Sequence, residues 1–280
     1  MDEASRMDSP VQDRSKKSPD EAPIDAKLSI AMVSSGEAFV VVRLALTALL
    51  CLSGLGAALA APARIIILRH GEKATAYKLC DVGRERAEAL TTTYLGRGAA
   101  KSLFASGEAP AAILAITLHA LELASPSAAS WGEPLTLYSV LPDKDADEDE
   151  KAELLNRRTQ EAAHDVMTDP RYAGKTVVMV WEHKHIANKK LEDTFPGKAV
   201  TLRQLLKLDQ LHGVPEKWPS GTYDYFWIAE YGNQGSDVPT RFHMVKQEFG
   251  ASYDAVPSND WDQPNGLEPE SGCDLKGAQD

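Results

Sequence analysis

The sequence predicts a three-layer α/β/α sandwich with a mostly parallel central sheet. Short runs of apolar, often β-branched residues alternate with helical patterns along the chain, which is typical of helices packed on both faces of such a sheet. The chain has 280 residues, of which 43% are hydrophobic and 25% charged, so it is long and apolar enough for a substantial core. In sheets of this kind, ligands bind beyond the carboxyl ends of the strands.

Five apolar segments are expected to form the strands. Each is short and consists mainly of aliphatic or aromatic side chains, the pattern of strands that are buried on both faces. In chain order, the strands are expected over residues 64–68, 112–116, 135–138, 176–181 and 225–229.

Helical patterns fill the intervals between the strands. Asp81 can cap a helix over 81–94, because its carboxylate can accept hydrogen bonds from the first turn. A second helix is expected over 119–127 and to end near Pro126, since proline removes a backbone donor. Further helices are expected from within the acidic segment 143–150 to about residue 167, and over 186–191.

Six of the eight residues from 143 to 150 are acidic. The segment is similar to a calcium-binding loop, but Glu148 stands where the EF-hand turn needs glycine, and Leu154 stands where a bidentate glutamate belongs. The pattern instead predicts a solvated loop and a helix N-terminus, where the helix dipole favours acidic side chains.

The N-terminal 60 residues differ from the rest of the chain. Residues 1–36 are rich in Asp, Ser, Lys and Pro, and we expect them to be disordered. The apolar run over 44–55 has the length of a signal-peptide core, and Ala58 and Ala60 supply a small-x-small cleavage site. We therefore expect export, to the periplasm or outside the cell, and removal of residues 1–60.

A membrane anchor over residues 38–61 is the alternative, although the uninterrupted apolar run is shorter than the roughly 20 residues of a membrane span. Residues 61–280 are expected to form one domain. Its C-terminal tail, from about residue 250, is rich in Pro, Asp, Asn and Gly and is expected to be irregular.

Cys80 and Cys273 remain if the signal peptide is removed. An exported compartment is oxidising, so these cysteines could form a disulfide. Their separation in the sequence does not determine their distance in space, and the pairing stays open at this point.

The formal net charge of −11 argues against a nucleic-acid partner, because such proteins need clustered Lys and Arg. Any anionic substrate must therefore be attracted by a local basic pocket. The aromatic side chains near the last strand are expected in the core and the pocket wall. They are Trp218, Tyr223, Tyr225, Phe226 and Trp227.

Two of the predicted strands end in a histidine. His70 follows the first strand and His183 follows the fourth, so both imidazoles are expected at the same edge of the sheet. Around them stand the segments Leu68-Arg-His-Gly-Glu-Lys73, Leu79-Cys-Asp-Val-Gly-Arg-Glu-Arg-Ala87 and His183-Lys-His-Ile186. On these segments, which span most of residues 64–190, the sequence resembles the histidine phosphatase superfamily, also called phosphoglycerate mutase-like.

The resemblance implies a phosphatase without cofactor or metal that acts on a small phosphorylated substrate. It implies that His70 attacks phosphorus and forms a phosphohistidine, which agrees with the nucleophilic chemistry of a neutral imidazole. Arg69 and His183 are implied to hold the phosphoryl oxygens, and a guanidinium suits that task. Glu72 either orients groups near the substrate or forms a surface salt bridge with Lys73.

The sequence departs from the family at His119. Members of the family usually carry a second arginine here, at the start of the helix after the second strand. A protonated His119 can still donate to phosphate, but the loss of a charge-assisted contact is typically worth about 1.5–3 kcal/mol. A degenerate member that binds a phosphorylated ligand or a protein without turnover is therefore the alternative hypothesis.

The residue that protonates the leaving group is left open among Glu182, Asp143 and Asp145. Glu182 adjoins His183, but it is expected on the opposite face if the strand alternation continues. His183 and His185 are spaced like metal ligands, yet no cysteine or third carboxylate accompanies them, so no metal site is expected.

Overall fold

The computed structural model describes residues 61–141, 146–232, 236–268 and 271–274. The expected signal peptide or anchor and the candidate acids Asp143 and Asp145 lie outside these ranges and stay predictions. Within the described ranges, no helix is long and apolar enough to cross a membrane.

A six-stranded sheet with the order β5-β4-β6-β1-β7-β8 forms the centre of the structure. Its strands are β1 Arg64–Arg69, β4 Ala112–Ala115, β5 Leu135–Leu137, β6 Thr176–Trp181, β7 Tyr225–Glu230 and β8 Arg241–Lys246. The neighbours from β5 to β1 are parallel, while β7 runs antiparallel to β1 and to β8. The mostly parallel sheet is thus confirmed.

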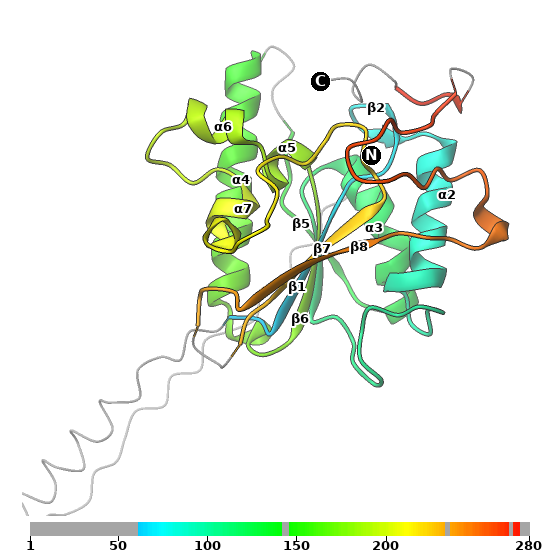
Figure 1. Cartoon of the computed structure of the whole chain (residues 1–280), viewed down its shortest axis with the longest axis horizontal. Coiled ribbons are helices and arrows are strands. Elements are labelled where there is room, and N and C mark those ends of the chain that lie inside the picture. The colour runs from blue at the N-terminus through cyan, green and yellow to red at the C-terminus, as the bar shows by residue number, and fades with distance from the viewer. Residues whose placement is uncertain (1–60, 142–145, 233–235, 269–270, 275–280) are drawn as a thin grey trace, which may run out of the picture. The chain divides into compact units, whose positions relative to one another are not determined.

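Helices cover both faces of this sheet, so the three-layer α/β/α architecture is also confirmed. Figure 1 shows α2 (Asp81–Leu90) and α3 (Leu118–Trp131) on one side, with α4 (Glu148–Thr168), α6 (Lys189–Thr194) and α7 (Leu202–Leu205) on the other. Side chains of β1 alternate between two apolar clusters, with Ile65 and Ile67 in one, and Ile66 and Leu68 in the other. Because both faces of β1 are covered, its successive residues from Ile65 to Leu68 are all apolar, as the sequence predicts for a buried strand.

Smaller elements complete the fold. They are the hairpin of β2 (Lys73–Thr75) and β3 (Lys78–Leu79), the short helix α5 (His183–Ile186), the π-turn η1 (Thr91–Leu95), and the 3₁₀ turns η2 (Pro170–Tyr172), η3 (Leu208–Gln210) and η4 (Ala251–Tyr253). Helix α4 begins with a capping box between Asp147 and Glu150, as the acidic segment predicts.

Several predicted boundaries are wrong. Cys80, not Asp81, is the N-cap of α2. Pro126 lies inside α3 instead of ending it, since the helix is held by its buried face and tolerates one missing backbone bond. The helix expected over 186–191 is two helices, because Asn188 has an extended backbone and caps the second one. Strand β8 was not predicted, because as an edge strand it is only partly buried and mixes charged with apolar residues.

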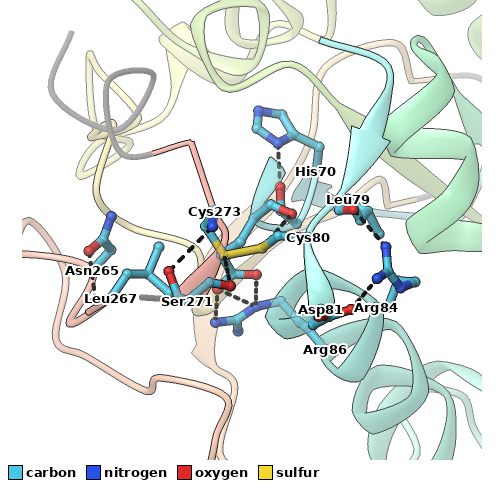
Figure 2. The surroundings of a disulfide bond; sticks show 12 residues. His70, Leu79, Cys80, Asp81, Arg84, Arg86, Asn265, Leu267, Ser271 and Cys273 are labelled. Atoms are coloured by element: carbon cyan, nitrogen blue, oxygen red, sulfur yellow. Dashed lines mark hydrogen bonds and ion pairs between the residues drawn. A yellow bond between two sulfur atoms is a disulfide. The ribbon is translucent and has the colours of Figure 1, made fainter. Parts of the chain in front are cut away.

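The C-terminal tail is irregular apart from η4, as predicted, but several contacts attach it to the domain. Trp261 packs against Trp218 and Tyr225 with ring centroids 5.3 and 5.2 Å apart. Cys273 forms a disulfide with Cys80, directly before α2 (Figure 2). The pairing that the sequence left open is therefore present in the structure.

Candidate functional site

His70 follows β1 at the carboxyl edge of the sheet and is almost completely buried. Its Nδ1 lies 2.7 Å from the carbonyl oxygen of Gly71. A carbonyl only accepts hydrogen bonds, so Nδ1 carries the hydrogen and Nε2 keeps its lone pair. Nε2 lies 3.4 Å from Nη2 of Arg69 and 3.4 Å from Oε2 of Glu182. The ring therefore presents a nucleophilic nitrogen to the neighbouring charged groups.

Two further histidines converge on His70. The ring centroid of His119, from the start of α3, lies 4.6 Å away, and that of His183, from the start of α5, lies 5.9 Å away. Among the described residues, neither ring nitrogen of the buried His183 has a hydrogen-bond partner. A buried polar side chain without a partner is typical of a site that a ligand completes.

Arg69 is held rigidly beside these rings. Its Nη1 donates to the backbone carbonyls of Pro219, Ser220 and Thr222 at 3.3, 2.5 and 3.3 Å, and its guanidinium stacks on the Tyr223 ring at 3.8 Å. Its Nε is buried without a partner among the described residues, and its Nη2 points to His70. Arg69 therefore keeps donors available for an anion next to His70 Nε2.

Glu182 lies in the same site, and its expected position on the opposite face is wrong. The strand ends at Trp181, Glu182 is the N-cap of α5, and His183 is already helical, so the alternation of a strand no longer applies. Oε1 of Glu182 lies 2.6 Å from Nε2 of His119, while Oε2 faces His70. Glu182 thus bridges the two imidazoles.

Glu72 lies beside these groups, and its contacts contradict one of its two predicted roles. It is fully buried, and both of its carboxylate oxygens accept hydrogen bonds from Arg86 in α2, the shortest at 2.6 Å. Arg86 also forms an ion pair with Asp224 at 2.8 Å. The surface salt bridge with Lys73 is therefore wrong, and Glu72 anchors the segment after His70 to the core.

The electrostatics of the site favour neutral imidazoles beside a carboxylate. Burial lowers the pKa of His70 to about 4, and the nearby Arg69 acts in the same direction. Burial also lowers the pKa of His183 well below its ordinary value. Burial alone would raise the pKa of Glu182, but its interactions with His70 and His119 outweigh this and hold it well below the ordinary value. His70 is therefore uncharged at neutral pH, as a nucleophile must be.

One atom each of His70, Glu182 and His183 lie within 4.8 Å of one another, close enough for all three to hold a metal ion. His183 and His185, which are spaced like metal ligands in the sequence, do not face one site, because His185 bonds Asn156 at 3.0 Å. The Arg69 guanidinium beside the three-residue group repels a metal ion and attracts an anion, whereas the Glu182 carboxylate does the opposite.

No sequence pattern marks the groups that hold Arg69 and Arg86. The three carbonyls that fix Arg69 are backbone atoms, which every residue possesses, so no side-chain pattern marks them. Tyr223 was expected only as part of the core and pocket wall, and its contact with the Arg69 guanidinium depends on the path of the loop before β7.

No protein-family model matches the sequence, and no curated protein is similar to it. Among solved structures, the chain is similar to mycobacterial glucosyl-3-phosphoglycerate phosphatase, with 16% identity and a TM-score of 0.36 over 67% of this chain and 99% of the other. For the same enzyme with inorganic phosphate, the values are 14% and 0.32 over 73% and 99%. A second similar structure is mycobacterial hydrolase 2, with 14% identity and a TM-score of 0.35 over 68% and 93%.

The fold and the site agree with the expectation that the sequence raised. An Arg69-His70 pair ends a central parallel strand, and a second histidine, His183, follows the neighbouring strand and faces the first. Those are the features that the resemblance to the histidine phosphatase superfamily implies.

Proposed function

We propose that the protein is a phosphatase that hydrolyses a small phosphoester through a phosphohistidine intermediate. The observation that carries this proposal is the hydrogen bond between His70 Nδ1 and Gly71, which leaves Nε2 free to act as a nucleophile beside Arg69. The His183 ring lies 5.9 Å from that of His70, and its nitrogens have no hydrogen-bond partner within the described part of the chain. Buried donors around a nucleophile suit a phosphoryl group, because its transfer depends mainly on positioning and electrostatic stabilisation.

In this proposal, Nε2 of His70 forms a bond to phosphorus while the bond from phosphorus to the leaving oxygen breaks. Arg69 and His183 stabilise the oxygens of the phosphoryl group, and a proton delivered through Glu182 goes to the leaving oxygen. A water molecule then attacks phosphorus, its proton returns to Glu182, and the N–P bond breaks.

The experiment compares hydrolysis of an aryl phosphate by the wild type and the His70→Ala variant. The control is His185→Gln, which also removes a buried imidazole. We expect the alanine variant to fall to the background rate and the control to stay close to the wild type. A chelator is expected to leave the activity intact. Loss of activity on chelation would instead favour a metal-dependent hydrolase.

The second candidate is a protein that binds a phosphorylated ligand without turnover. The observation in its favour is His119, which stands at the position of the family's second arginine. Equal rates for the wild type and His70→Ala, together with calorimetric binding of inorganic phosphate by the wild type, would leave only this reading.

We also propose that the protein is exported. The disulfide between Cys80 and Cys273 supports this, because structural disulfides are typical of oxidising compartments. N-terminal sequencing of the secreted product tests the proposal. A chain that keeps residues 38–61 in the membrane fraction would indicate an anchor.

A further inference from the structure

His119 stands where members of the family carry an arginine, and its ring contacts groups of the protein itself. His119 Nδ1 lies 2.8 Å from the carbonyl oxygen of Ala76, and Nε2 lies 2.6 Å from Glu182 Oε1 and 3.0 Å from the hydroxyl of Thr117. Both ring nitrogens are therefore engaged by groups of the protein itself. Since a histidine has only two such nitrogens, His119 has no donor left for a phosphoryl oxygen.

These contacts also locate a proton. Nδ1 must donate to Ala76, because the carbonyl can only accept. Nε2 and Glu182 Oε1 then share one proton across a short contact of 2.6 Å. The pKa of Glu182 lies well below its ordinary value because of His70 and His119, so its carboxylate accepts this hydrogen bond and His119 Nε2 donates it.

From this arrangement we infer that His119 is a positioning residue that holds the proton for Glu182, and that it is not a replacement for the missing arginine. The inference rests on the proposed phosphatase function and concerns the same site. When a phosphoryl dianion lies between His70 and Arg69, its negative charge raises the proton affinity of the adjacent Glu182. The proton then moves from His119 Nε2 to Glu182 and on to the leaving oxygen as the P–O bond breaks.

The return of the proton follows the same path. During hydrolysis of the phosphohistidine, Glu182 takes a proton from the attacking water and passes it to His119 Nε2, so the resting state is restored. The other titratable groups that interact with Glu182 are His70, Arg69, His183, His185 and Tyr223. His70 contacts Glu182 at 3.4 Å, but its pKa is lowered to about 4, so it does not hold this proton near neutral pH.

A leaving-group series distinguishes this role from phosphate binding. 2,4-Dinitrophenolate departs without a proton, whereas phenolate, which like the tyrosine side chain has a pKa of about 10, needs one. For His119→Gln, we expect kcat/KM with phenyl phosphate to fall by roughly 10²-fold or more, the typical contribution of an acid catalyst, while kcat/KM with 2,4-dinitrophenyl phosphate stays close to wild type.

The matched variants are Glu182→Gln, which should give the same selective loss, and His119→Arg, which restores the arginine of the family. We expect His119→Arg to show the selective loss as well, because a guanidinium does not release its proton. An equal loss on both substrates in His119→Gln, or a gain of activity in His119→Arg, would overturn the inference and indicate a phosphate-binding role.

A second measurement does not depend on turnover. In ¹⁵N NMR spectra of the full chain, we expect both ring nitrogens of His119 to carry hydrogen near neutral pH in the wild type, and only one in Glu182→Gln. A singly protonated His119 in the wild type overturns the inference. If the wild type hydrolyses neither aryl phosphate, the proposed function is refuted. The spectra would still show which nitrogens of the His119 ring carry hydrogen.

Discussion

Replacement of the disulfide cysteines by serine is expected to destabilise the protein strongly. The bond joins Cys80 and Cys273 across 193 residues, so it closes a loop that contains most of the described domain. The loop-entropy relation gives about 18 cal/mol/K for a loop of this length, or about 5 kcal/mol at 25 °C. Measured losses for native disulfides are about 2–5 kcal/mol, so the calculated value is an upper estimate.

The assay is denaturation in urea of the wild type, the two single serine variants and the double variant. Because either single substitution breaks the same bond, all three variants should lose the same free energy of unfolding. Their m-values should rise, since an unfolded chain without the crosslink exposes more surface. A reductant should destabilise only the wild type.

A loss of less than about 1 kcal/mol in the double variant would refute the reasoning, because it would mean that the crosslink does not constrain the unfolded chain. Thiol titration of the unfolded wild type distinguishes the two causes of such a result. Free Cys80 and Cys273 would show that the bond is absent, and blocked thiols would show that its entropic effect is small.

Three further predictions concern the buried charges and the packing near His70. Arg86→Met leaves the buried Glu72 and Asp224 without their cation and should lower the free energy of unfolding by about 3–5 kcal/mol, more than Glu72→Gln does, as measured by urea denaturation. The folded pKa of His70, about 4, is below the unfolded value of 6.5, so its contribution to stability is lost as the pH falls from 6.5 to 4. This decrease in the free energy of unfolding is about 3 kcal/mol. It should be absent in His70→Gln when unfolding in urea is measured over the same pH range. Gly83→Ala places a Cβ 2.2 Å from the carbonyl oxygen of Glu72, so it should lower both the thermal stability and the activity, whereas Gly98→Ser meets no atom within 4 Å and should affect mainly its own turn.

Much of the site was predictable because it depends on where strands end. His70 and His183 follow apolar runs that are typical of buried strands, and the carboxyl ends of parallel strands share one edge. That the two strands are direct neighbours is known only from the structure. The position of Glu182 was not predictable, since strand alternation holds only while the backbone stays extended, and here it turns into α5 one residue later. A shift of a single residue in the end of a strand is below the precision of sequence patterns.

The contacts of His119 and Arg86 required the tertiary structure for another reason. His119 meets Glu182 across 63 residues of sequence, and Arg86 meets Gln247 across 161. From the sequence alone, several other acidic or polar side chains could equally be the partners of these two residues. Only the packing of α2 and α3 against one face of the sheet selects among them.

The sequence by itself therefore determined the layers of the fold, the strand that carries His70 and the edge at which His183 would meet it. These follow from the periodicity of apolar residues, which is a local property of the chain. Only the tertiary structure decided that His119 bonds Glu182, that Glu72 is buried against Arg86 and that Cys80 pairs with Cys273. Such contacts join segments far apart in the chain, so their geometry depends on how the whole core packs and has no counterpart in any local pattern.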